Sequence, residues 1–229
     1  MKIGIIGAGH VGGTLARRLT ALGHDVAIAN SRGPETLATL AAETGAAATT
    51  TREAARDKDL VIVAIPVKNV RDLPKDLFAS GKTPIIVDTG NYYPKRDGHI
   101  RPIDDGVPES KWVSQQLGKP VVKAFNTIYA QHLLAFGRAA DQPGRIALPV
   151  AGDDAASKAV VIRLIDELGF DGIDAGTLDE SWRQQPGTPV YGTDLGAEAL
   201  PKALSAARRE RPSEFRAAAD MPTTASRFQ

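Results

Sequence analysis

Residues 2–13 read KIGIIGAGHVGG, and this stretch decides the fold class. Residues 2–6 are rich in β-branched side chains, as a buried strand is, and a run of glycines follows them directly. Leu15, Leu19 and Leu22 then recur at helical spacing. A strand that passes through a glycine-rich turn into a helix is the opening unit of a doubly wound α/β sheet.

The same alternation of strands and helices continues along the chain. Residues 25–30, 60–65 and 84–87 form β-rich runs with helical stretches between them. The run Leu60–Ile65 is wholly apolar, which is typical of a strand buried on both faces of a parallel sheet. Further strands are predicted at 121–122, 146–151 and 170–174, with an amphipathic helix at 155–168. We therefore expect an α/β protein with a Rossmann-type doubly wound parallel sheet and a small C-terminal α/β extension.

Four local patterns complete the expected outline. Residues 91–108 are rich in proline, glycine and charge, and they predict a long surface loop. Asp153 is expected to cap the helix at 155–168. Residues 194–209 predict a helix that Pro201 interrupts, and residues 221–229 predict a frayed tail.

The composition excludes several classes of function. The chain has 229 residues with 28 Lys and Arg against 27 Asp and Glu, so neither nucleic acid nor an anionic membrane surface is expected as a partner. Because cysteine is absent, disulfides, thiol catalysis and cysteine-ligated metals are excluded, and the four histidines lack the paired spacing of a metal site. No apolar run reaches the roughly 18 residues of a membrane span. We expect a soluble, cytoplasmic, globular protein without a metal.

The glycine pattern Gly7-x-Gly9-x-x-Gly12 follows a predicted strand and opens a predicted helix. In that context the first glycine permits the tight turn, the second lets the backbone approach a diphosphate, and the third lets helix and strand pack closely. His10 and Val11 begin the helix, whose N-terminal amides favour an anion. These five residues are predicted to bind a dinucleotide, the alternative being a glycine-rich turn that binds nothing.

The residues after the second strand indicate which dinucleotide is bound. A chain that binds NAD usually carries Asp or Glu at this place, to accept from a ribose hydroxyl. Here the sequence is Asn30-Ser31-Arg32, which has no carboxylate to repel a 2′-phosphate. Ser31 offers a hydroxyl, and Arg32 offers a planar fork that can pair with phosphate. We therefore predict NADP(H), the alternative being an exposed turn whose arginine only adds solubility.

Ligands of open α/β sheets lie at the carboxyl ends of the strands. That rule predicts that the walls of the nicotinamide site are formed by Ala64, Ile65 and Pro66, together with Asp88–Asn91. For Asp88, the structural role of a loop or helix-capping carboxylate is an equal alternative to a cofactor contact.

The sequence shows no Tyr-x-x-x-Lys pair and no Gly-x-Ser-x-Gly nucleophile elbow. Carbonyl reduction needs a positioned proton donor, whereas hydride exchange between a nicotinamide and a flavin-type ring needs mainly two stacked rings. Hydride exchange with a flavin-type ring is therefore favoured, although Lys123, Tyr129 or His132 could be the proton donor for carbonyl reduction.

Several of these segments resemble a known group of enzymes. The glycine loop, Asn30-Ser31-Arg32, residues 122–128 (VKAFNTI) and residues 150–154 (VAGDD) are similar to the NADPH-dependent deazaflavin oxidoreductases. They are equally similar to the cytosolic oxidoreductase domain of the six-transmembrane epithelial antigen metalloreductases. The most specific segment is Lys123-Ala124-Phe125-Asn126.

The resemblance implies a division of the chain and of its functions. Residues 1–125 would form the NADP-binding Rossmann domain, and residues 126–229 a small domain with the acceptor site and the contacts of a homodimer. Ser31 and Arg32 would hold the 2′-phosphate, while Ile65, Pro66 and Asn126 border the nicotinamide and the acceptor. Pro66 and Asn126 would position that acceptor, a flavin or deazaflavin, and no catalytic acid is assigned.

The chain departs from the deazaflavin enzymes at two points. Its glycine loop is one residue shorter than in the archaeal enzymes, and Asn126 stands where those carry histidine; both features are those of the metalloreductases. Residues 181–189 match neither group well. Two alternatives stay open: an NADP-dependent imine or carbonyl reductase of the pyrroline-5-carboxylate reductase type, and a non-enzymatic module that senses NADP.

Overall fold

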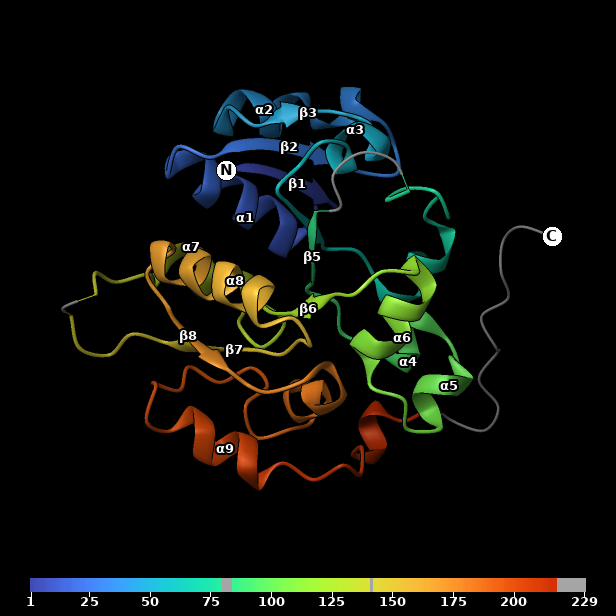
Figure 1. Cartoon of the computed structure of the whole chain (residues 1–229), viewed down its shortest axis with the longest axis vertical. Helices are drawn as coiled ribbons and strands as arrows, with labels where there is room; N and C mark the ends of the chain where they lie inside the picture. Colours follow the sequence, from blue (N-terminus) through green and yellow to red (C-terminus); the bar gives the residue numbers. More distant parts are fainter. Residues whose placement is uncertain (80–83, 141, 218–229) are drawn as a thin grey trace.

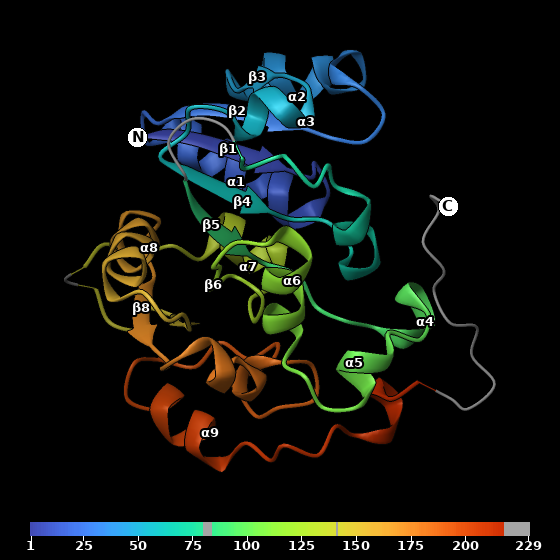
Figure 2. The same cartoon turned by 45° about the vertical axis from the view of Figure 1, so that its right-hand side comes forward.

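A computed structural model describes residues 1–79, 84–140 and 142–217. Within these residues a six-stranded, wholly parallel sheet has the order β3-β2-β1-β4-β5-β6 (Figures 1 and 2). Its strands are β1 (Lys2–Ile6), β2 (Asp25–Ala29), β3 (Ala47–Ala48), β4 (Leu60–Val63), β5 (Ile85–Asp88) and β6 (Val122–Lys123). The order reverses between β1 and β4, which places a ligand crevice at the carboxyl ends of these two strands.

Side chains alternate across this sheet and build an apolar core on each face. On β1, Ile3 and Ile5 pack with helix α1 (His10–Ala21), whereas Ile6 packs with helix α3 (Thr51–Ala55). The first face also holds α2 (Ala38–Thr44) and α7 (Ala130–Ala135), and the second holds α6 (Glu109–Leu117). In Figure 2, α6 lies beside β5 and β6, with the short helices α4 (Pro94–Asp97) and α5 (Arg101–Asp104) beyond it. Helices on both faces make the sheet doubly wound, as predicted.

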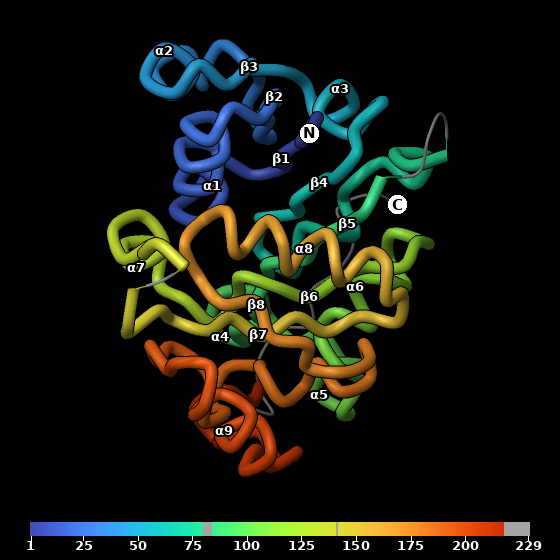
Figure 3. Tube along the Cα trace, turned by 60° about the vertical axis from the view of Figure 1, so that its left-hand side comes forward, coloured from blue at the N-terminus to red at the C-terminus, as the bar shows by residue number. Residues whose placement is uncertain are grey.

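The C-terminal part adds a second, two-stranded parallel sheet. Strands β7 (Ala147–Val150) and β8 (Asp171–Asp174) lie between α8 (Ala155–Glu167) and α9 (Leu200–Ala206), which Figures 1 and 3 both show. An antiparallel bridge between Lys123 and Ala151 joins β6 to the end of β7. Short 3₁₀ turns complete the chain: η1 (Pro34–Leu37), η2 (Val67–Asp72), η3 (Leu178–Gln184) and η4 (Ser213–Phe215). The predicted C-terminal α/β extension is therefore confirmed.

Three local predictions need correction. Residues 91–108 are not a surface loop: they form α4 and α5, and Ile100 and Ile103 are buried in the core beside α6. Prolines occupy the first turns of both helices, where the missing N–H costs nothing. The N-cap of α8 is Asp154 rather than the predicted Asp153: the carboxylate of Asp154 accepts from the backbone N–H of Ser157 at 2.8 Å, whereas that of Asp153 accepts from the amide of Leu178 at 2.9 Å.

The helix predicted at 194–209 is shorter than expected. Only Leu200–Ala206 is helical, because Pro201 begins the helix rather than interrupting it. The predicted tail, 221–229, lies outside the described residues. No helix of the described residues is long and apolar enough to cross a membrane.

Candidate functional site

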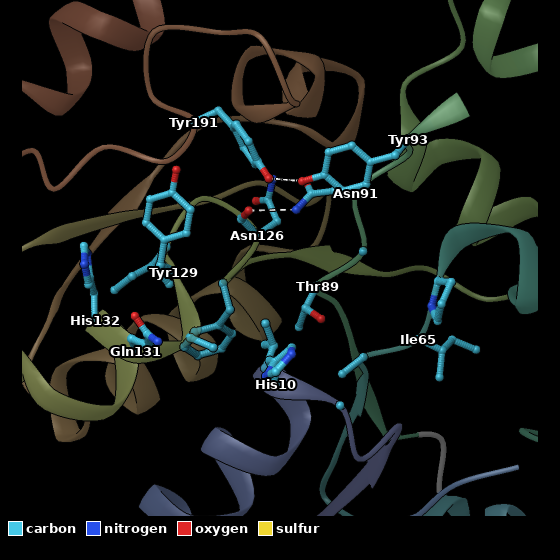
Figure 4. Close-up of a pocket in the computed structure, with 18 of the residues that line it drawn as sticks. His10, Ile65, Thr89, Asn91, Tyr93, Asn126, Tyr129, Gln131, His132 and Tyr191 are labelled. Atoms are coloured by element: carbon cyan, nitrogen blue, oxygen red, sulfur yellow. Dashed lines mark hydrogen bonds between the residues drawn. The ribbon is translucent and has the colours of Figure 1, made fainter. Parts of the chain in front are cut away.

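Two cavities meet at the carboxyl ends of the parallel strands. The smaller, of about 540 Å³, contains Asn30, Ser31 and Arg32 in its wall. The larger, of about 750 Å³, is shown in Figure 4. Four residues line both cavities: Gly9, Ala64, Ile65 and Pro66. The structure thus brings together the predicted glycine loop, the turn after β2 and the end of β4.

The three glycines of the loop serve different purposes. Gly7 has a φ of +113°, and a Cβ on it would lie 2.3 Å from the carbonyl oxygen of Ala64. A Cβ on Gly12 would lie 1.9 Å from the carbonyl oxygen of Gly7, so that glycine is required for close packing of helix and strand. A Cβ on Gly9 would meet nothing within 4 Å. The fold itself therefore has no need of glycine at position 9, and the open space lies where a diphosphate would approach.

The start of α1 fits an anionic group. Gly9 is the N-cap of this 12-residue helix and provides no side chain to cap it. No acidic residue occupies the first turn of α1, and His10 and Val11 line the larger cavity. The unpaired amides and the helix dipole favour negative charge at this end. The residues present therefore fit the diphosphate of a dinucleotide.

The turn after β2 is shaped by Asn30. Its Oδ1 accepts from the backbone N–H of Arg32 at 2.9 Å, and its Nδ2 donates to Oγ1 of Thr36 at 2.9 Å. Ser31 and Arg32 are exposed at the wall of the smaller cavity. Asn30 thus holds the backbone, while the side chains of Ser31 and Arg32 are available to a phosphate.

Asn126 lies in the wall of the larger cavity within a closed network of amides. Its Nδ2 donates to Oδ1 of Asn91 at 3.0 Å and to the carbonyl oxygen of Gln184 at 2.6 Å. Its Oδ1 accepts from Nε2 of Gln184 at 2.9 Å. The neighbouring Phe125 has a φ of +61°, which is an uncommon and strained conformation for an aromatic residue. The network therefore holds this strained turn against the end of β5.

A buried charge pair lies beneath the same wall. Nζ of Lys123 is 3.2 Å from Oδ2 of Asp88 and also donates to the carbonyl oxygen of Gly90. Asp88 accepts in addition from Oγ of Ser110 at 2.7 Å and from the amide of Gly90 at 2.8 Å. Lys123 is completely buried, so it is not available as an acid in the cavity. Asp88 thus supports the loop, in agreement with the structural role predicted for it rather than with a cofactor contact.

The other two sequence-predicted acids line the larger cavity. Nδ1 of His132 lies 3.0 Å from Oδ1 of Asp194, and its ring stacks on Phe136 with centroids 4.6 Å apart. Tyr129 meets the same imidazole edge-on and is 55% exposed. Both side chains lie along the left of the cavity in Figure 4.

Two tyrosines that were not predicted from the sequence, Tyr93 and Tyr191, also line the larger cavity. Their hydroxyls form a hydrogen bond across the larger cavity, at the top of Figure 4. Burial raises the pKa of Tyr191, and the hydrogen bond to Tyr93 raises it further. Tyr93 follows β5 and could have been found by the strand-end rule, but nothing local links it to Tyr191, 98 residues later. Among the residues described, no cluster of His, Asp or Glu could hold a metal ion.

The sequence and the structure are both similar to those of known proteins. The structure superposes on a hypothetical protein, SMa0349 of Sinorhizobium meliloti, with a TM-score of 0.74, 33% identity, and coverage of 85% of this chain and 95% of the other. Residues 2–92 match the family model described as NADP oxidoreductase, coenzyme F420-dependent. Residues 2–92 therefore belong to this family, and they support an NADP-dependent oxidoreductase; the sheet is of the Rossmann type.

Two further relatives are similar over less of the chain. A protein of Arthrobacter sp. FB24, described as a candidate F420-dependent NADP reductase, has a TM-score of 0.65 and 27% identity, covering 78% of this chain and 86% of its own. The protein YjhV of Escherichia coli (strain K12) is 42% identical over 66 residues, which are 29% of this chain. The matched segment spans 48%, about half, of the length of YjhV.

Proposed function

We propose that this oxidoreductase transfers hydride between NADP(H) and a flavin or deazaflavin ring. The larger cavity supports the proposal, because its volume of about 750 Å³ far exceeds what a nicotinamide ring alone would fill. Its wall is formed mainly by aromatic and uncharged side chains: Tyr93, Phe125, Tyr129, Tyr191, Ile65 and Ile128. A wide space with such walls suits a second planar ring.

The nucleotide would extend across both cavities. Ser31 and Arg32 would bind its 2′-phosphate, and the amides at Gly9, His10 and Val11 its diphosphate. Ala64, Ile65 and Pro66 would contact the nicotinamide, with Pro66 stiffening the wall where β4 ends. When bound, NADPH supplies a hydride; the chain's own contribution is to hold two rings in contact and exclude water from between them.

The amide network around Asn126 would position the acceptor. Because both polar atoms of its side chain are hydrogen-bonded to Asn91 and Gln184, Asn126 acts by fixing the wall rather than by reacting. The description of the Arthrobacter relative and that of the family both name a deazaflavin coenzyme, which supports this class of acceptor.

A spectrophotometric assay tests the proposal. We expect the purified protein to oxidise NADPH in the presence of 8-hydroxy-5-deazaflavin, FMN or FAD, and to do so faster than with NADH. Reduction of a cyclic imine or a carbonyl compound, but of no flavin or deazaflavin, would support the pyrroline-5-carboxylate reductase type instead. Binding of NADPH with no reduction of any acceptor would support a sensing module.

The homodimer, the cytoplasmic location and the division at residue 125 belong to the same proposal. Sedimentation equilibrium tests the dimer and cell fractionation the location. The exposed apolar side chains of Tyr129, Leu134 and Phe136, in and beside α7, are available for a contact between copies.

A further inference from the structure

The hydroxyl pair Tyr93–Tyr191 joins two distant parts of the chain at the larger cavity. Tyr93 follows β5, and Tyr191 lies in the segment after η3, beyond residues 181–189. A pair of phenols has two O–H donors, of which only one can be used between them. In the described part of the chain neither hydroxyl has another hydrogen-bond partner, so one O–H is left to a ligand.

Both rings are held in place by their surroundings. The ring of Tyr93 packs against Phe215, with centroids 6.3 Å apart, and the guanidinium of Arg96 lies 4.9 Å from its centroid. The backbone next to Tyr191 is anchored because the amide of Gly192 donates to the carbonyl oxygen of Thr127 at 2.9 Å. The free O–H is therefore presented at a fixed place in the cavity wall, opposite His10 in Figure 4.

We propose that the Tyr93–Tyr191 pair donates this O–H to a ring carbonyl oxygen of the acceptor. The inference deepens the proposed function and rests on it. In this step the C4–H bond of the dihydronicotinamide would break as a new bond forms at N5 of a flavin or C5 of a deazaflavin, so that NADPH is oxidised to NADP⁺ and the acceptor ring is reduced by two electrons. Negative charge would then develop on the nitrogen and carbonyl oxygen of the pyrimidine edge of that ring. Water then supplies the proton that neutralises the ring. A hydrogen bond to that oxygen strengthens as the charge develops, which lowers the barrier.

The environment of the pair favours hydrogen bonding over proton transfer. Burial and the contact with Tyr93 raise the pKa of Tyr191, so its phenol stays protonated at neutral pH. A phenol that holds its proton this firmly is a persistent donor but a weak acid. The pair thus acts like one member of an oxyanion hole, and residues from both sides of position 125 are needed to form it.

The double variant Tyr93→Phe/Tyr191→Phe tests this role. Each single variant would leave one hydroxyl whose proton is free, so removal of both is decisive. We expect the rate of single-turnover hydride transfer to FMN or 8-hydroxy-5-deazaflavin to fall about 10- to 100-fold, the range of one hydrogen bond to a charged group. The dissociation constant for NADPH should stay within about twofold. Anaerobic titrations give the dissociation constants of the protein for oxidised and for reduced FMN. The ratio of these two constants, which measures the preference for reduced FMN, should fall by a similar factor.

Tyr92→Phe is the matched control. It removes the neighbouring hydroxyl, which donates to Asp104 at 2.9 Å and lines neither cavity. This variant should lose thermal stability but keep the hydride-transfer rate and the FMN preference. If the double variant keeps both quantities at the wild-type level, the inference is wrong while the proposed function stands. If the wild-type protein reduces neither acceptor, both fail.

Discussion

At the scale of single residues, Gly9 is where the demands of the ligand and of the fold can be separated. Its φ of −77° and ψ of −164° are open to any residue, and a Cβ there would touch no other atom of the chain within 4 Å. We expect Gly9→Val to fold normally and to lose NADPH binding, because its methyl groups would occupy the approach of the diphosphate. Calorimetric titration and a thermal melt measure the two effects.

Gly12→Ala provides the opposite case. Its Cβ would lie 1.9 Å from the backbone oxygen of Gly7, so the helix would have to move away from the strand. We expect this variant to melt at a clearly lower temperature than Gly9→Val. Unchanged NADPH affinity in a folded Gly9→Val protein would contradict the assignment of the dinucleotide.

Selectivity for NADPH is also decided by single residues. Arg32 and Ser31 are exposed at the turn that Asn30 shapes, and no carboxylate stands at the end of β2. Arg32→Ala should weaken NADPH binding by about tenfold. This loss is at the lower end of the range for a charge-assisted hydrogen bond, because salt screens an exposed contact. NADH binding should be nearly unchanged. Asn30→Asp should weaken NADPH binding further, since it places a negative charge near the phosphate.

Dissociation constants for both nucleotides, measured at one moderate salt concentration, test this prediction. Equal affinity of the wild-type protein for NADH and NADPH would show that the turn does not recognise a 2′-phosphate. A loss of NADH affinity in Arg32→Ala equal to the loss for NADPH would instead assign Arg32 to a part that both nucleotides share.

At the scale of elements, the loop after β6 links the sheet to the acceptor wall. Replacement of Asn126 by leucine keeps the size of the side chain but leaves Asn91 and Gln184 without three hydrogen bonds. The strained backbone at Phe125 would then lose its support. We expect Asn126→Leu to lower kcat about tenfold or more, with NADPH affinity within about twofold, because positioning acts mainly at the transition state.

Steady-state kinetics and nucleotide titration of the same variant separate these effects. Equal losses of rate and of NADPH affinity would assign Asn126 to the nucleotide instead of the acceptor. Thermal unfolding should begin at a lower temperature in this variant, since buried amides without partners are costly.

The elements of the fold and of the candidate site differ in how well the sequence predicts them. The parallel strands, the glycine loop and the turn after β2 are contiguous in sequence, and their apolar runs and glycine spacing predicted them and their meeting point. The helices within 91–108 were missed, because the proline, glycine and charge content of this stretch predicted a loop, whereas Pro94 and Pro102 lie in the first turns of helices. Tyr191 reaches the cavity, and Gln184 reaches Asn126, only through the packing of the C-terminal part, so neither was predicted.

At the scale of the whole molecule, residues on both sides of position 125 share one core. The largest buried cluster combines Ile3, Leu15 and Ile62 with Leu133, Leu148 and Leu164. Arg18 of α1 donates to the carbonyl oxygens of Leu133 at 2.8 Å and Leu168 at 2.6 Å. The division at residue 125, which stays a prediction about roles, therefore does not separate two independent hydrophobic cores.

This shared core predicts a single cooperative unfolding transition. A fragment of residues 1–125 would expose the face of the sheet and of α1 that α7, β7 and α8 now cover, and the burial of apolar side chains is the main stabilising contribution to folding. We expect the full chain to give one calorimetric transition, and the fragment to give none. NADPH at about 100 times its dissociation constant should stabilise the whole transition by about 2.7 kcal/mol. Two resolved transitions, only one of which moves with NADPH, would show instead that the two parts fold separately.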